Sequence, residues 1–140
     1  MPDATARAVL YVEDDRINTI LMEEVFRRLP GWTLECAEDG TQALALLQTL
    51  SPDLLLIDMN LPDMCGLELL RGLRSDPRLA GHAHMPCIAL SADDRREDIE
   101  AARRAGFADY WVKPIDVPRL TSALQEVLLI ATAQTQKSPV

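Results

Sequence analysis

The sequence predicts an α/β domain in which five parallel strands form a doubly wound sheet, in (βα)5 order. Two observations predict this fold. Short apolar runs alternate with amphipathic stretches five times along the chain, and three of the runs are apolar nearly throughout. A strand without polar residues is covered on both faces, as in a parallel sheet. Alternation of strands and helices implies right-handed crossovers that place helices on both faces.

The apolar runs are the predicted strands. They lie at residues 8–12, 32–36, 54–57, 87–90 and 110–112. The second run, from Trp32 to Cys36, alternates between apolar and polar residues. We therefore expect this strand nearer an edge of the sheet, where one side is less covered.

Each gap between strands has helical periodicity, with apolar residues three and four positions apart on one stripe. The stripes are Ile17, Leu21, Val25 and Leu29; Ala43, Leu44, Leu47 and Leu50; Leu67, Leu70 and Leu73; and Leu120, Leu124, Val127 and Leu128. The helix predicted over 94–105 differs, because its buried face would be Ile99, Ala102 and Ala105. Small side chains bury little area, so we expect this helix to be the most weakly anchored.

Length and composition indicate one folded domain. A chain of 140 residues has the usual size of a single domain, and 48% hydrophobic residues rule out a disordered chain. We expect one domain over 1–130 and a flexible tail over 131–140, because the chain is polar from Thr132 onward.

Charge and cysteine content exclude several classes of protein. The net charge of −8 argues against direct binding of nucleic acid. We find neither an apolar run long enough to span a membrane nor a signal peptide. The cysteines, Cys36, Cys65 and Cys87, are odd in number and far apart, which argues against a disulfide framework or a zinc site and favours a reducing cytoplasm.

Polar side chains follow four of the predicted strands. They are Glu13-Asp14-Asp15, Asp58, Ser91 and Lys113. Taken singly, each has a plain structural explanation, such as a helix cap for Asp15. Ligands of open α/β sheets bind beyond the carboxyl ends of the strands, however, so we expect these groups to converge there.

Crowded carboxylates raise one another's pKa unless a cation lies among them. Three carboxylates with one lysine lack about two positive charges, which a divalent ion with oxygen ligands such as Mg²⁺ supplies. An aspartate beside Mg²⁺, a lysine and a hydroxyl is suited to accept a phosphoryl group as the nucleophile.

The motifs around these residues resemble the receiver domain of two-component response regulators of the chemotaxis-regulator type. The motifs lie at 12–15 (VEDD), 56–66 (LIDMNLPDMCG), 89–92 (ALSA) and 105–114 (AGFADYWVKP), and the resemblance covers Ala8 to Leu129. Four motifs in the right order and spacing make it specific. It implies a flavodoxin-like fold with the strand order 2-1-3-4-5.

The resemblance also implies the roles of the acidic residues. Asp58 is similar to the phosphoacceptor, and Asp14 to the direct Mg²⁺ ligand. Glu13 matches its acidic neighbour, which acts through water. Asn60 takes the place where the family uses a backbone carbonyl as a metal ligand.

Further roles follow from the resemblance for the later strands. Ser91 matches the switch hydroxyl, Lys113 the lysine that contacts the phosphoryl group, and Tyr110 the switch aromatic. The Lys113-Pro114 bond is expected to be cis. The segment 74–85 is longer than in the shortest members, and we interpret its His82 and His84 as solvated loop residues.

The function implied is that of a signalling module and not an enzyme, with self-phosphorylation and autodephosphorylation as its only activities. Its donor would be a histidine kinase or a histidine phosphotransfer protein. Phosphorylation of Asp58 would then reshape the face formed by the helix 94–105, the last strand and the last helix. That face would control a downstream protein target and is a possible homodimer interface.

Several alternatives stay open at this stage. We favour a stand-alone response regulator, because of the Met1 start and the short ends, over a receiver from a hybrid histidine kinase, whose style the residues around Asn18 and Lys113-Pro114 resemble. A phosphate-independent protein-binding module is a third possibility. A phosphatase of the haloacid dehalogenase type is disfavoured, because Asn60 stands where its general acid would be.

Overall fold

A computed structural model describes residues 7–136, with side chains described as far as residue 126. Five parallel strands form one sheet in the order β2-β1-β3-β4-β5. They are β1 (Arg7–Val12), β2 (Trp32–Ala37), β3 (Leu54–Asp58), β4 (Cys87–Ser91) and β5 (Asp109–Val112). The predicted fold class and strand order are confirmed, and β2 is an edge strand as expected.

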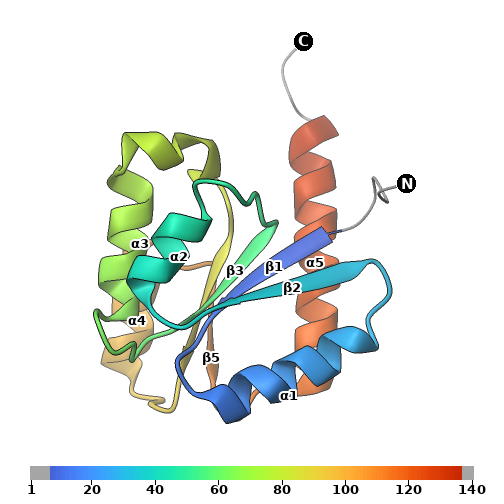
Figure 1. Ribbon diagram of the computed structural model, residues 1–140, viewed down its shortest axis with the longest axis horizontal. Helices are drawn as coiled ribbons and strands as arrows, with labels where there is room; N and C mark the ends of the chain where they lie inside the picture. Colours follow the sequence, from blue (N-terminus) through green and yellow to red (C-terminus); the bar gives the residue numbers. More distant parts are fainter. Residues whose placement is uncertain (1–6, 137–140) are drawn as a thin grey trace.

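Helices cover both faces of the sheet (Figure 1). They are α1 (Arg16–Arg27), α2 (Gly40–Leu46), α3 (Gly66–Ser75), the 3₁₀-helix η1 (Pro77–His82), α4 (Arg96–Ala105) and α5 (Val117–Gln136). Residues of α2, α3 and α4 share one hydrophobic core with the sheet, and those of α1 and α5 share the other. Every residue of β3 and β4 is buried, and all of them are apolar except the last residue of each strand, Asp58 and Ser91.

The face that α1 turns to the sheet differs from the predicted stripe. Met22 and Phe26 are its buried residues, whereas Ile17 and Leu21 are 70% and 59% exposed. Two neighbouring rows of this helix carry apolar side chains at a spacing of four, and periodicity alone does not distinguish them. The predicted core position of Ile17 and Leu21 is therefore wrong, and α1 presents apolar side chains at the surface.

Helix α4 is anchored by few side chains. Ala102 is its one fully buried residue, and Ile99 packs partly against the core. Ala105 is exposed, contrary to the expected buried face, because the helix ends there and the chain turns away at Gly106 with a φ of 114°. The weak anchoring expected for this helix agrees with its small buried surface.

Two further segments differ from the expected outline. The segment predicted as a long loop contains η1, which buries Leu79 against the core of α2, α3 and α4. Helix α5 extends to Gln136, past the predicted domain end at residue 130. Residues 137–140 of the predicted flexible tail lie outside the described part of the chain, and its flexibility stays a prediction. Between residues 7 and 136, no helix combines the length and apolarity needed to cross a membrane.

Candidate functional site

Three acidic side chains meet at the carboxyl edge of the sheet. Glu13, Asp14 and Asp58 each place a carboxylate oxygen within 4.8 Å of the others. Glu13 and Asp58 are buried, with 1% and 5% of their surface exposed, and Asp14 is exposed. The sequence thus predicted the convergence of these carboxylates correctly.

Backbone hydrogen bonds continue the sheet just beyond the strands. The amide of Glu13 donates to the Ala37 carbonyl at 2.9 Å, and the amide of Lys113 donates to the Ser91 carbonyl at 2.8 Å. A residue held in this way keeps the alternating direction of the strand that precedes it. The sheet therefore fixes where the side chains of Glu13 and Lys113 emerge.

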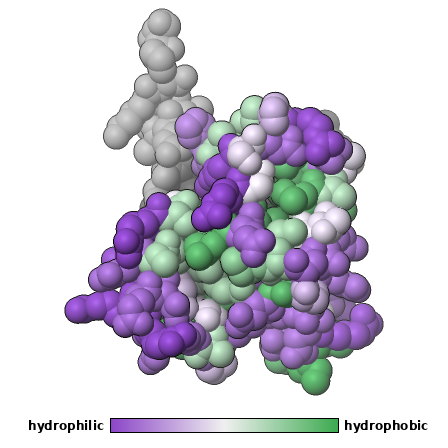
Figure 2. Space-filling view, turned by 90° about the vertical axis from the view of Figure 1, so that its left-hand side faces the viewer, coloured by the Kyte–Doolittle hydropathy of each residue, from purple (hydrophilic) through white to green (hydrophobic). Residues whose placement is uncertain are grey.

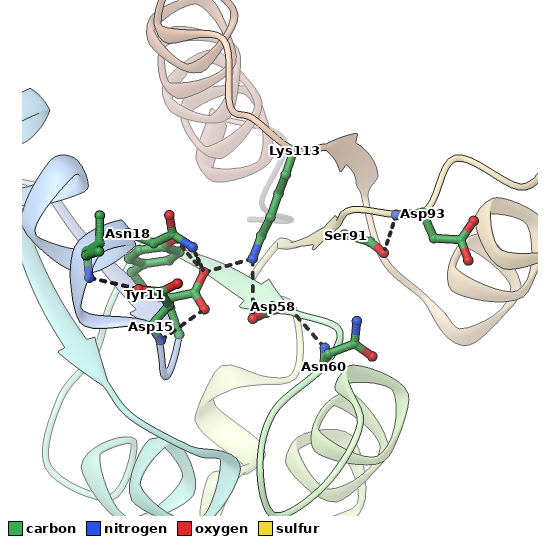
Figure 3. Close-up of polar contacts among 10 residues, drawn as sticks. Tyr11, Asp15, Asn18, Asp58, Asn60, Ser91, Asp93 and Lys113 are labelled. Carbon is green, nitrogen blue, oxygen red and sulfur yellow. Dashed lines mark hydrogen bonds and ion pairs between the residues drawn. The ribbon is translucent and has the colours of Figure 1, made fainter.

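The ammonium group of Lys113 lies between two buried carboxylates (Figure 3). Its Nζ is 2.9 Å from Glu13 Oε1 and 3.3 Å from Asp58 Oδ2. Burial by itself lowers the pKa of Lys113, but the hydrogen bond to Glu13 and the two negative charges outweigh it and raise the pKa. Lys113 is therefore a charged partner of both acids. Its bond to Pro114 is cis, as predicted.

Glu13 and Asp58 differ in which of them keeps its charge. Burial and the neighbouring Glu13 raise the pKa of Asp58 from 3.8 to about 6. Burial also acts to raise the pKa of Glu13, but hydrogen bonds from Asp58 and Lys113 reverse this effect and lower it. Glu13 also accepts hydrogen bonds from Tyr11, Asn18 and the Asp15 amide. Without a metal, Asp58 is therefore the member of this pair that takes up a proton first as the pH falls.

Ser91 and Tyr110 both contact the backbone of Asp93. Ser91 Oγ accepts a hydrogen bond of 3.1 Å from the Asp93 amide, and the Tyr110 hydroxyl donates one of 2.6 Å to the Asp93 carbonyl. Ser91 ends β4, the strand next to β3, and Tyr110 lies in β5. Tyr110 is buried, so this structure already holds its ring inward. Both predicted switch residues thus meet at the segment that leads into α4.

Comparison with known proteins identifies the family. Residues 9–125 match the family model of the response regulator receiver domain. The chain belongs to this family. It is 34% identical over 122 residues to the polar-differentiation response regulator DivK of Brucella anthropi, which covers 87% of this chain and 96% of DivK. DivK of Brucella ovis is similar to the same degree.

Solved structures agree with this assignment. The chemotaxis response regulator CheY4 of Vibrio cholerae has a TM-score of 0.77 and 27% identity, over 88% of this chain and 99% of CheY4. The receiver domain of sensor histidine kinase PA1611 from Pseudomonas aeruginosa has a TM-score of 0.74 and 30% identity, over 86% of this chain and 96% of that domain. That structure has a magnesium ion coordinated in its active site cleft.

The acidic cluster of this receiver fits a hard divalent cation. Glu13, Asp14 and Asp58 offer only oxygen ligands, which Mg²⁺ prefers. Burial and then the neighbouring Glu13 raise the pKa of Asp58, even though the charge of Lys113 acts to lower it. Asn60, the fourth predicted ligand, lies beside the cluster, and its amide donates to Asp58 Oδ1 at 3.1 Å.

Other acidic side chains have structural roles. Asp15 is the N-cap of α1, because its carboxylate accepts a hydrogen bond of 2.9 Å from the Ile17 amide. This agrees with the interpretation of Asp15 as a helix cap.

His82 was interpreted as a solvated loop residue, and the structure differs. It lies in η1 and places Nε2 2.7 Å from the Leu47 carbonyl oxygen, so it packs against the end of α2.

Two residues that contact the site, Tyr11 and Asn18, were not predicted from the sequence. Both donate hydrogen bonds to Glu13, from an apolar strand and from a helix. A strand places side chains two residues apart on the same face, so Tyr11 was detectable from its spacing to Glu13. Asn18 carries no comparable signal, because its contact depends on how α1 approaches the sheet.

Proposed function

We propose that this receiver accepts a phosphoryl group on Asp58 from the phosphohistidine of a histidine kinase or a histidine phosphotransfer protein. The observation that carries the proposal is the arrangement of Lys113 between two buried carboxylates, with Asp14 beside them. The Asp58 oxygen attacks phosphorus, the phosphorus–nitrogen bond breaks, and an acyl phosphate and a free histidine result.

The residues of the chain have separate tasks in this transfer. Glu13, Asp14, Asp58 and the backbone carbonyl of Asn60 would hold Mg²⁺. When bound, the ion neutralises charge on the transferring group and lowers the pKa of Asp58. Lys113 and Ser91 contact the phosphoryl oxygens, because an ammonium and a hydroxyl form charge-assisted hydrogen bonds with them. Loss of the phosphoryl group to water makes the signal reversible.

The donor protein has an apolar surface to bind close to Asp58. Ile17, Ile20 and Leu21 on α1 are exposed at 70%, 44% and 59%. Beside them a pocket of about 370 Å³ opens between α1 and the start of α5. Its apolar lining includes Leu21, Val25, Pro114, Ile115 and Val117. Exposed apolar side chains beside a reactive site are typical of protein docking surfaces.

The output surface lies on the other side of the site. Ser91 and Tyr110 both reach the segment before α4, so a change at Asp58 would act on the α4-β5-α5 face. Figure 2 shows the side of the molecule that carries α3 and α4, where apolar patches lie among hydrophilic residues. We propose that the α4-β5-α5 face controls a downstream protein and is a possible homodimer interface.

We propose a stand-alone response regulator of the cytoplasm. The similarity to DivK over 96% of its length supports this organisation. The alternative is a receiver attached to a histidine kinase, as the PA1611 domain is. A receiver that binds a partner without phosphate is the alternative from another class.

Intact-mass spectrometry tests the proposed chemistry. The protein is incubated with acetyl phosphate, with and without Mg²⁺, alongside Asp58→Asn. We expect the mass of one phosphoryl group to be added to the wild type only when Mg²⁺ is present, and none to be added to the variant. A folded wild type that gains no mass under either condition would favour the phosphate-independent binding module.

A further inference from the structure

The Glu13 carboxylate is held by more donors than any other acid of the site. Its Oε1 accepts hydrogen bonds from the Tyr11 hydroxyl at 3.0 Å, from Asn18 Nδ2 at 3.2 Å and from Lys113 Nζ at 2.9 Å (Figure 3). Its Oε2 accepts from the Asp15 amide at 3.3 Å. Only 1% of Glu13 is exposed, so water does not replace a donor that leaves.

Only one of the three donors to Oε1 has a second partner in the site. Lys113 also pairs with Asp58 at 3.3 Å, whereas the Tyr11 hydroxyl and the Asn18 amide contact Glu13. Tyr11 comes from β1 and Asn18 from the first turns of α1. Glu13 Oε1 is thus held by two neutral groups, one from β1 and one from α1, and by one cation that it shares with Asp58.

Transfer of a phosphoryl group to Asp58 gives the ammonium group of Lys113 a further anionic partner. The phosphoryl oxygens bring further negative charge and attract the ammonium away from Glu13. A buried carboxylate that loses its cation is costly unless other donors remain. The hydrogen bonds from Tyr11 and Asn18 satisfy Glu13 while Lys113 contacts the phosphoryl group.

We propose that Tyr11 and Asn18 are positioning residues, which hold the Glu13 carboxylate in place and thereby leave Lys113 available to the phosphoryl group on Asp58. The inference deepens the proposed function and rests on it. A fixed Glu13 also keeps the carboxylates of the acidic cluster in position to bind Mg²⁺. Loss of either donor weakens metal binding and slows phosphorylation.

The test uses Tyr11→Phe, Asn18→Ala and the double variant. Thr19→Ala is the matched control, since Thr19 is a half-buried residue next to Asn18 whose hydroxyl donates to the Arg16 carbonyl of its own helix. Mg²⁺ affinity is measured by calorimetry on the unphosphorylated protein, and phosphorylation by acetyl phosphate is followed by intact mass at saturating Mg²⁺. We expect phosphorylation of the double variant to be about tenfold slower than that of the wild type, because both lost hydrogen bonds were made to a charged group. We expect Mg²⁺ binding to weaken several-fold and Thr19→Ala to behave as the wild type.

A double-mutant cycle with Lys113→Met separates positioning from a general structural role. If Tyr11 acts by leaving Lys113 available, Tyr11→Phe slows phosphorylation in the wild type and has little further effect in Lys113→Met. Equal slowing in both backgrounds overturns the inference, as do wild-type Mg²⁺ affinity and rate in the double variant. If the wild type itself takes no phosphoryl group, the proposed function fails, and the Mg²⁺ titration alone then decides whether Tyr11 and Asn18 position Glu13.

Discussion

Lys113 Nζ lies 2.9 Å from Glu13 Oε1, although the two residues are 100 positions apart in the sequence. The sheet order makes this contact possible, because the carboxyl ends of β1 and β5 lie at one edge with β3 and β4 between them. The same ammonium reaches Asp58. One cation thus serves two buried carboxylates and leaves an excess of negative charge where Asp14 lies close by.

Lys113→Met tests this charge balance. Methionine keeps most of the apolar stem and removes the cation, so Glu13 and Asp58 lose their shared partner. We expect the free energy of unfolding at pH 7 to fall by about 2 kcal/mol, because removal of the ammonium leaves buried negative charge without its cationic partner. Mg²⁺ should stabilise the variant more than the wild type. Urea unfolding with and without Mg²⁺ measures both effects, with Arg16→Met at an exposed position as control. Equal stabilisation of the two proteins by Mg²⁺ would contradict the charge argument.

Asp58→Asn should stabilise the metal-free protein in a pH-dependent way. The folded protein raises the pKa of Asp58 from 3.8 to about 6, so the folded state holds this proton more tightly than the unfolded state. Stability from protonated Asp58 is complete below pH 4 and is lost as the pH rises through about 6. Asparagine has no charge to lose. We expect the variant to be more stable than the wild type by about 2 kcal/mol at pH 7.5, and the difference to shrink toward pH 4.

Urea unfolding at pH 4.5, 6 and 7.5 measures this difference. Other groups titrate in both proteins, so comparison at each pH isolates Asp58. Addition of Mg²⁺ should reduce the advantage of the variant at pH 7.5, because a cation favours the charged carboxylate in the folded state. A difference that is constant with pH would show that Asp58 is not the group that takes the proton.

The sequence predicted the strands and the acidic cluster because both depend on local pattern. Apolar runs mark β3 and β4, and Asp58 follows from its place at the end of one of them. The buried face of α1 was not predictable, because Leu21 and Met22 belong to adjacent apolar rows and only tertiary packing selects one of them. The contact of Asn18 with Glu13 also depends on the placement of α1 against the sheet.

Exposed apolar residues of α1 should affect transfer from a protein donor and not from a small one. Leu21→Glu changes a side chain that is 59% exposed, so the free energy of unfolding should change by about 0.5 kcal/mol or less. Phosphorylation by acetyl phosphate should keep its rate. Transfer from the cognate phosphohistidine protein should show a KM raised at least about tenfold, because a charge replaces buried apolar contact. Glu23→Ala, at a position of α1 that is also exposed, is the control. An unchanged KM would remove this surface from the donor interface.

Tyr110→Phe should loosen the segment before α4. The Tyr110 hydroxyl donates to the Asp93 carbonyl at 2.6 Å, and phenylalanine keeps the ring while losing this bond. Since α4 buries few side chains, we expect amide exchange over residues 93–99 to accelerate by about fivefold. Exchange in β3 should stay as in the wild type. In the wild type, exchange in α4 should also change on phosphorylation, and exchange as slow as in the sheet in both states would exclude α4 as the moving part.

Arg74 should stabilise the fold without affecting phosphorylation. Its guanidinium donates to the carbonyls of His82, Ala83 and Met85 at 3.0, 2.7 and 2.9 Å, which fixes the chain between η1 and β4. Arg74→Ala removes these charge-assisted bonds, and we expect a loss of about 2 kcal/mol in the free energy of unfolding. Arg71→Ala, which changes an exposed residue of the same helix, should have little effect. The segment precedes the amino end of β4, opposite to Ser91, so acetyl phosphate should modify Asp58 at the wild-type rate. Slower phosphorylation of the folded Arg74→Ala protein would show that this segment is coupled to the site.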